Sequence, residues 1–97
     1  MSLNELASKY IGSAEHVFDR IEVAEPPVTL NLTRVRNVLD FAKAYLNDAR
    51  YYREKKKFEV SLTSIAYCEG LLDGLRLLGA VRFEWPTRKE ETEPSGK

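Results

Sequence analysis

The residues best suited to chemistry are carboxylates and tyrosines in the second half of the chain. Glu69 and Asp73 are four residues apart, so on a helix their carboxylates lie on one face. Two such carboxylates can hold a hard cation or act as an acid and a base. Asp48 approaches them if the flanking helices pair as a hairpin. The predicted polar hairpin site consists of Asp48, Tyr51, Tyr52, Tyr67, Glu69 and Asp73.

A structural role for these carboxylates is the simpler interpretation. Helical bundles that bind two metal ions need a carboxylate from each of several helices together with Glu-x-x-His pairs, and this sequence contains no such pair. We therefore predict no metal and no cofactor. Salt bridges across the hairpin, or hydrogen bonds to buried tyrosines such as Tyr45, Tyr52 and Tyr67, are then the expected role of the carboxylates.

No other set of residues predicts catalysis. The only histidine, His16, has Glu15 and Asp19 nearby but no nucleophile that the sequence places beside it, so we expect an exposed side chain. The only cysteine, Cys68, lies on an apolar stripe and is expected to be a small buried residue. It excludes an internal disulfide and a zinc site with several cysteines. We predict no catalytic residue and favour a protein that is not an enzyme.

Charge is uneven along the chain, although 15 basic and 15 acidic residues sum to zero. Residues 33–57 contain eight basic and three acidic residues, whereas acidic residues are in excess on both sides. Cations mixed with aromatic rings are typical of nucleic-acid contacts. The alternative is that this basic segment lies between two acidic helices and neutralises them. The candidate nucleic-acid-binding residues are Arg50, Arg53, Lys55, Lys56 and Lys57.

Apolar residues recur at steps of three and four over three stretches of the chain, which predicts an all-α fold. The predicted helices cover residues 3–22, 34–55 and 58–78. Ser2 and Glu5 form a capping-box pattern before the first helix, and Thr33 is a suitable N-cap for the second. Gly79 stands where the third helix needs a C-terminal cap.

The connections between these helices predict their order in space. Pro26 and Pro27 remove two backbone donors, so residues 23–32 are expected to form an extended loop. Only a short turn around Lys56 separates the second and third helices, which predicts an antiparallel hairpin. In an up-down-up three-helix bundle, the three apolar stripes can then close on one core.

A chain of 97 residues has room for one domain. We assign residues 1–85 to a single bundle domain, in which residues 80–85 fold back onto one end, and residues 86–97 to a disordered polar tail. No apolar run is long enough to span a membrane, and the first residues lack the basic-then-apolar pattern of a signal peptide. We therefore expect no membrane association and a cytoplasmic location.

The predicted hairpin resembles a known family over residues 33–79. The element Asp48-Ala49-Arg50-Tyr51-Tyr52 and the segment from Tyr67 to Gly79 look like the archaeal domain-of-unknown-function family 357. Two departures affect packing, since Cys68 and Gly74 stand where alanine is usual, and one affects capping, since Lys57 stands where aspartate is common. The residues that match the family pattern are Asp48, Tyr51, Tyr52, Tyr67, Gly70 and Asp73.

The resemblance implies a small archaeal protein that forms a left-handed three-helix bundle. Some relatives are joined to a nucleotidyltransferase-type domain, which implies an accessory role. The resemblance implies no activity and no mechanism. The composition, which is 31% charged and contains no glutamine, is typical of an archaeal thermophile.

Three functions are compatible with these patterns. The favoured one is a non-catalytic interaction or accessory module that docks a partner protein or a second copy of itself through exposed apolar residues. The alternative is a nucleic-acid or nucleotide-binding accessory domain that uses the basic end of the second helix. The second alternative is a small-ligand or metal site at the polar hairpin site. The apolar residues expected to be exposed are Phe41, Val60, Phe83 and Trp85.

Overall fold

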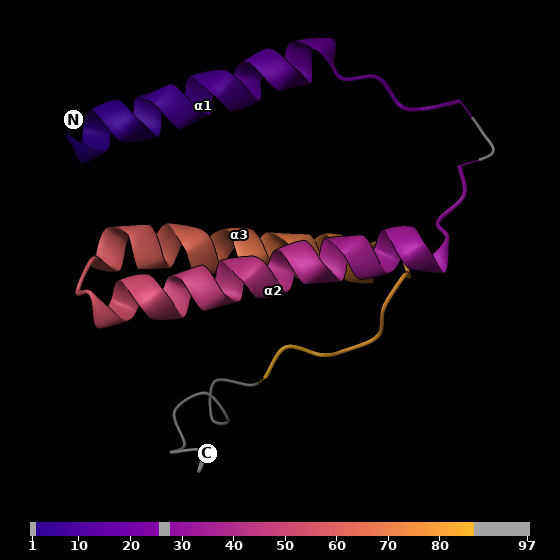
Figure 1. The fold of residues 1–97 in the computed structure, drawn as a ribbon. Coiled ribbons are helices and arrows are strands. Elements are labelled where there is room, and N and C mark those ends of the chain that lie inside the picture. The colour runs from indigo at the N-terminus through magenta and orange to yellow at the C-terminus, as the bar shows by residue number, and fades with distance from the viewer. Residues whose placement is uncertain (1, 26–27, 87–97) are drawn as a thin grey trace.

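The described part of the chain contains three helices and the segments that connect and follow them. The computed structural model describes residues 2–25 and 28–86. The helices are α1 (Leu3–Arg20), α2 (Leu32–Glu54) and α3 (Phe58–Leu77). The chain runs along α1, returns along α2 and reverses again into α3 (Figure 1). The all-α class and the up-down-up order are thereby confirmed.

Two parts of the predicted architecture are not decided by this arrangement. The left-handed packing implied by the family resemblance stays a prediction. The polar tail expected over residues 86–97 lies outside the described residues except for Pro86.

Local capping signals fix the start of the first two helices. The Ser2 hydroxyl accepts a hydrogen bond from the backbone amide of Glu5 at 3.0 Å, and the Glu5 carboxylate accepts one from the backbone amide of Ser2 at 2.9 Å. These bonds confirm the capping box and lower the pKa of Glu5 below its usual value. The cap of α2 was placed two residues late, because Asn31 and not Thr33 accepts the amide of Arg34, at 2.8 Å.

The end of α3 follows the predicted cap. Gly79 has a φ of 77°, the left-handed region that suits glycine. The amide of Ala80 then donates to the carbonyl of Leu75, and the amide of Gly79 donates to the carbonyl of Arg76, both at 2.9 Å. This cap turns the chain back so that residues 80–86 run along α3. We call residues 80–86 the strap.

α2 and α3 pack through small residues repeated every seven positions. Ala42 and Ala49 are buried on α2, and Cys68 is buried on α3. The Ser61 hydroxyl donates to the carbonyl of Ala49 at 2.7 Å, which joins the two helices across their contact. Small side chains at a seven-residue spacing let two helix backbones approach closely. We call this contact the hairpin seam; its residues are Val35, Ala42, Ala49, Ser61, Cys68 and Leu75.

α1 lies apart from the α2–α3 hairpin (Figure 1). None of its residues, all of which the structure describes, is buried, and no Cα atom of α1 lies within 8 Å of one in α2 or α3. The radius of gyration is 16.4 Å, against about 13 Å for a compact domain of about 100 residues. The buried core therefore comes from α2 and α3 alone, whereas the apolar spacing predicted a core that all three helices share.

The connections explain this difference. The turn between α2 and α3 spans only Lys55, Lys56 and Lys57, and such a short connection forces neighbouring helices together. The connection between α1 and α2 covers residues 21–31, which is long enough to impose no close approach.

Enlarging a seam residue tests the role of close packing. We expect Ala42→Leu to destabilise the protein by about 1–3 kcal/mol, because Ala42 is only 2% exposed and the added side chain must displace packed atoms. Urea unfolding followed by circular dichroism measures the change. The matched control is Ala44→Leu on the exposed side of α2, which should change stability by less than about 0.5 kcal/mol. Equal effects at both positions would contradict a tightly packed seam.

Candidate functional site

Asp73 fastens the strap to α3. One carboxylate oxygen, Oδ1, accepts hydrogen bonds from Arg76 Nη2 at 2.7 Å and Nε at 3.0 Å. The same oxygen accepts a bond from the indole nitrogen of Trp85 at 3.1 Å. The bonds from Arg76 and then Trp85 hold the pKa of Asp73 below its usual value. The negative charge of Asp73 therefore has a structural role, because the carboxylate holds Arg76 and Trp85 together.

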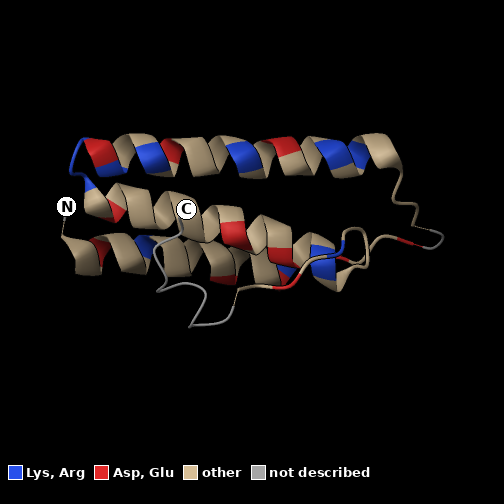
Figure 2. Ribbon diagram, turned by 90° about the horizontal axis from the view of Figure 1, so that it is seen from below, with Lys and Arg blue, Asp and Glu red and all other residues tan. Residues whose placement is uncertain are grey.

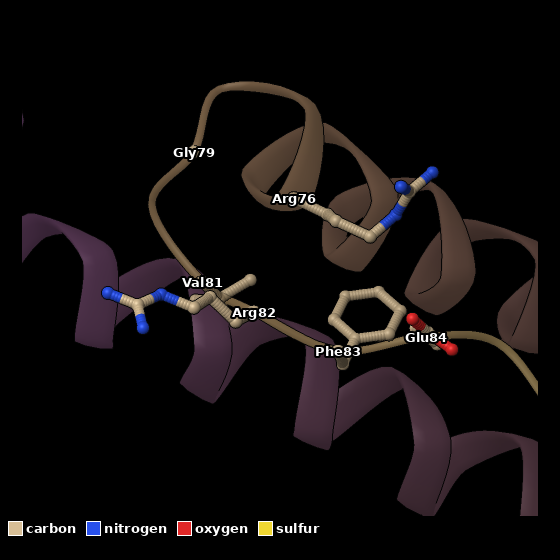
Figure 3. Close-up of a pocket in the computed structure, with 6 residues that line it drawn as sticks. All are labelled: Arg76, Gly79, Val81, Arg82, Phe83 and Glu84. Atoms are coloured by element: carbon tan, nitrogen blue, oxygen red, sulfur yellow. The ribbon is translucent and has the colours of Figure 1, made fainter.

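The strap packs on α3 through aromatic contacts. The rings of Phe83 and Trp85 meet edge to face, with centroids 4.9 Å apart. The guanidinium carbon of Arg76 lies 5.8 Å from the Phe83 ring centroid, and Figure 3 shows the two side chains beside an open hollow. This hollow has a volume of about 580 Å³ and is lined by Arg76, Gly79, Val81, Arg82, Phe83 and Glu84. The predicted fold-back of residues 80–85 is confirmed.

The carboxylates of the predicted polar hairpin site are only partly brought together. Glu69 and Asp73 line one hollow of about 290 Å³ with Trp85. Asp48 follows Tyr45 by one turn of α2, and Tyr45 lies on the other side of the hairpin seam, against Tyr67. Within the described residues, no three histidine, cysteine or acidic side chains lie close enough to hold a metal ion.

The tyrosines of this predicted site contact each other and not the carboxylates. The rings of Tyr45 and Tyr67 stack with centroids 4.4 Å apart, and Tyr51 meets Tyr52 edge to face at 5.1 Å. Tyr67 is 54% exposed, so the expectation of a buried ring there is wrong. Among residues 2–25 and 28–86, no tyrosine hydroxyl bonds to Asp48, Glu69 or Asp73. Asp73 instead accepts its hydrogen bonds from Arg76 and Trp85.

The single cysteine and the single histidine have the environments that the sequence predicts. Cys68 is buried in the hairpin seam, and burial raises the pKa of its thiol, as does the negative charge of Glu69. A thiol in such surroundings is a poor nucleophile. His16 is exposed on α1, where its Nδ1 lies 3.0 Å from Nη1 of Arg20.

The basic residues gather at the turn between α2 and α3 (Figure 2). The Lys55 ammonium lies 5.5 Å from the centroid of the Tyr51 ring, and Tyr51 is 56% exposed. The only ion pair in the described part of the chain joins Arg76 to Asp73. No ion pair joins α1 or α3 to this end of α2 in that part of the chain, and the alternative that the acidic helices neutralise its charge stays a prediction. We call Arg50, Arg53, Lys55, Lys56 and Lys57 the basic tip.

The apolar side of α1 is the largest feature whose exposure the sequence did not predict. Phe18 is 78% exposed, Leu3 63% and Ile11 58%. The spacing had identified this stripe, but as part of a shared core, because periodicity gives the apolar side of a helix and not what covers it. We call this side the α1 face; it comprises Leu3, Leu6, Ala7, Tyr10, Ile11, Ala14, Val17, Phe18 and Ile21.

Of the residues expected to be exposed, three are. Phe41 is 62% exposed, Val60 43% and Trp85 40%, whereas Phe83, which packs against Trp85, is half-buried.

Only the N-terminal half of α1 comes near α3. There Leu3, Leu6 and Tyr10 line a hollow of about 380 Å³ together with residues 59, 60, 62 and 63 of α3.

These features define a small all-α protein built on a tight helical hairpin, with an amphipathic helix beside it. No helix in the described ranges is long and apolar enough to cross a bilayer. The family model for the protein of unknown function DUF357 matches residues 9–81, so the chain belongs to this family, as the hairpin motifs predicted. Searches of curated proteins and of solved structures found no match.

Removing the Asp73 charge tests the attachment of the strap. Because Trp85 is the only tryptophan, its fluorescence reports whether the strap is docked. A carboxylate with a lowered pKa stabilises the folded state above its usual pKa and loses this effect as the pH falls through the lowered value. We expect the Trp85 emission to shift to longer wavelength as the pH falls below about 4, the usual pKa of an aspartate.

In Asp73→Asn, the emission should be shifted at neutral pH and should lack this transition. The control is Asp40→Asn on α2, which should keep the pH-dependent shift. Wild-type emission in Asp73→Asn would mean that the strap is held without the carboxylate.

Proposed function

We propose that this chain is a non-catalytic interaction or accessory module that binds another protein through the α1 face. The observation that carries the proposal is the exposure of this face along the whole helix. Phe18, Ile11 and Leu3 are each more than half exposed. Soluble proteins rarely leave a continuous apolar stripe of this length uncovered unless it binds something.

The energetics of α1 support a binding role. Fully burying one large apolar side chain stabilises a complex by about 1.5–3 kcal/mol, and the α1 face offers several. An isolated helix of 18 residues is only marginally stable in water, so α1 gains most from a surface that covers it. A partner that buries Val17 and Phe18 would supply this cover.

The chemistry of the remaining residues also favours binding over catalysis. The two reactive groups whose contacts are defined both stabilise the fold. Asp73 holds the strap against α3, and Cys68 packs in the hairpin seam. Glu69 has a hollow beside it, but no nucleophile lines that hollow, and the pKa of the other carboxyl group there, Asp73, is lowered.

Replacing one aromatic residue of the α1 face tests the proposal. We expect Phe18→Glu to reduce capture of partner proteins by tagged protein from cell extract at least tenfold, because a charge would have to be buried at the contact. Quantitative mass spectrometry of the captured proteins measures the loss. The matched control is Leu77→Glu, at a residue that is 74% exposed on α3. If Phe18→Glu captures the same proteins as the control, α1 does not mediate binding.

The basic tip supports a second candidate function, the binding of nucleic acid. Its cations carry no ion pair within the described residues, and Tyr51 presents an exposed ring beside Lys55. Cations next to an accessible aromatic ring suit a single strand, in which bases stack on the ring and phosphates meet the charges.

A charge reversal tests this candidate. We expect a variant with Lys55, Lys56 and Lys57 replaced by glutamate to lose binding to a fluorescent single-stranded oligonucleotide, measured by anisotropy. Wild-type affinity should fall with salt at a slope of about −0.7 per phosphate contact in a log–log plot. Reversal of Lys9 on α1 is the control and should leave binding unchanged. Binding that does not depend on salt would exclude this function.

A further inference from the structure

A groove on the α2–α3 hairpin has the properties needed to receive an apolar helix. It has a volume of about 290 Å³, and its walls are mainly aliphatic. Two seam residues, Ala42 and Cys68, form its floor. Lys43 stands at its edge as the one charged lining residue. We call this surface the hairpin groove; it is lined by Leu39, Ala42, Lys43, Leu46, Cys68 and Leu72.

Leucines and cations alternate along α2 beside the groove. They follow one another at steps of three and four, so they share one side of the helix. Leu39 and Leu46 enter the groove, and the cations extend its edge. The stripe consists of Leu32, Arg36, Leu39, Lys43, Leu46, Arg50 and Arg53.

One edge of α1 carries the complementary pattern. Apolar Ile11 and Phe18 alternate there with Glu15, again at steps of four and three. An α1 helix that lies in the hairpin groove can therefore bury its apolar face and set its acidic edge against the cations of α2.

The α1 helix of the same chain does not occupy the groove. Its N-terminal half lies near Thr63 of α3, whereas Leu72 of α3 lines the groove. These two residues are nine positions apart, or two and a half helical turns, so they face opposite sides of α3. Charge also disfavours the present neighbour, because α1 has three acidic and two basic residues and α3 has three acidic and one basic.

We propose that the hairpin groove receives α1 of a second copy of this chain, which gives a symmetric dimer. The proposal rests on the proposed function, of which it names the partner. Each copy then donates one α1 and receives one, the self-complementary arrangement of a two-fold dimer. The connection of residues 21–31 is long enough to let α1 reach across, as in the exchange of an element between copies.

The exposed area suits such an assembly. Ile11, Val17 and Phe18 of α1 are each more than half exposed and so are available for burial. A stable interface of ordinary size buries about 1,600 Å² in total. Docking two α1 helices in two grooves covers surface of that order.

The mass of the full chain in solution is the first test. Light scattering coupled to size exclusion, over a wide range of concentration, should give twice the 11.1 kDa of one chain. Phe18→Glu should return the mass to one chain while the helical circular dichroism of the hairpin is kept. Leu77→Glu, at a residue of α3 that is 74% exposed, is the control and should remain a dimer. Lys43→Glu should weaken the dimer about two- to fivefold.

The position of α1 is the second test. In a mixture of isotope-labelled and unlabelled chains, filtered NMR experiments detect only contacts between copies. We expect contacts from the Ile11 and Phe18 side chains to the methyl groups of Leu39 and Leu72. A monomer at every concentration would overturn the proposal. So would a dimer without these contacts, or the same contacts formed within one chain.

The failure of this proposal can be told apart from the failure of the proposed function. A monomeric chain that captures a different protein, and loses it in Phe18→Glu, would overturn the dimer and leave the binding role of α1 intact. If Phe18→Glu changes neither the mass nor the captured proteins, both are overturned.

Discussion

The close approach of α2 and α3 along the hairpin seam is the contact on which the rest of the structure depends. Alanine, serine and cysteine at seven-residue intervals leave little side chain between the two backbones, and the Ser61 hydroxyl bonds directly to the carbonyl of Ala49. Larger side chains are therefore displaced to the two sides of the hairpin. Leu39 and Leu72 lie on one side, and the stacked rings of Tyr45 and Tyr67 lie on the other.

A hairpin of two helices can cover a side chain from one direction only. Few residues are consequently buried, and the five that are belong to the hairpin seam. Domains usually solve this problem with a further layer packed on the first. The strap supplies a small part of that layer, because Trp85 and Phe83 pack on α3 and the Asp73 carboxylate anchors them. The leucines of the hairpin groove remain partly exposed to solvent, so the hairpin has an apolar surface that nothing in the described residues covers.

Local signals in the sequence predicted the helices well, and their assembly less well. The capping box at Ser2 and the glycine cap at Gly79 involve residues close in sequence, so their patterns are specific. The cap at Asn31 was missed because Thr33 is also an acceptable N-cap, although asparagine is the more favoured of the two. The predicted grouping of Asp48 with Glu69 failed because it required knowing which sides of two helices meet. An apolar stripe on α1 likewise gives no information on what covers it.

The separation of α1 from its own hairpin affects the energetics of the proposed docking. A helix that is marginally stable alone loses conformational freedom when it docks, and this cost reduces the affinity that its apolar area would otherwise supply. The charges of α1 then matter more for the choice of surface than for the strength of binding. Glu15 beside Phe18 disfavours the acidic helix α3 and favours the basic side of α2. In the proposed dimer, apolar burial therefore drives the docking of α1, and the uneven charge of the chain selects the surface on which it docks.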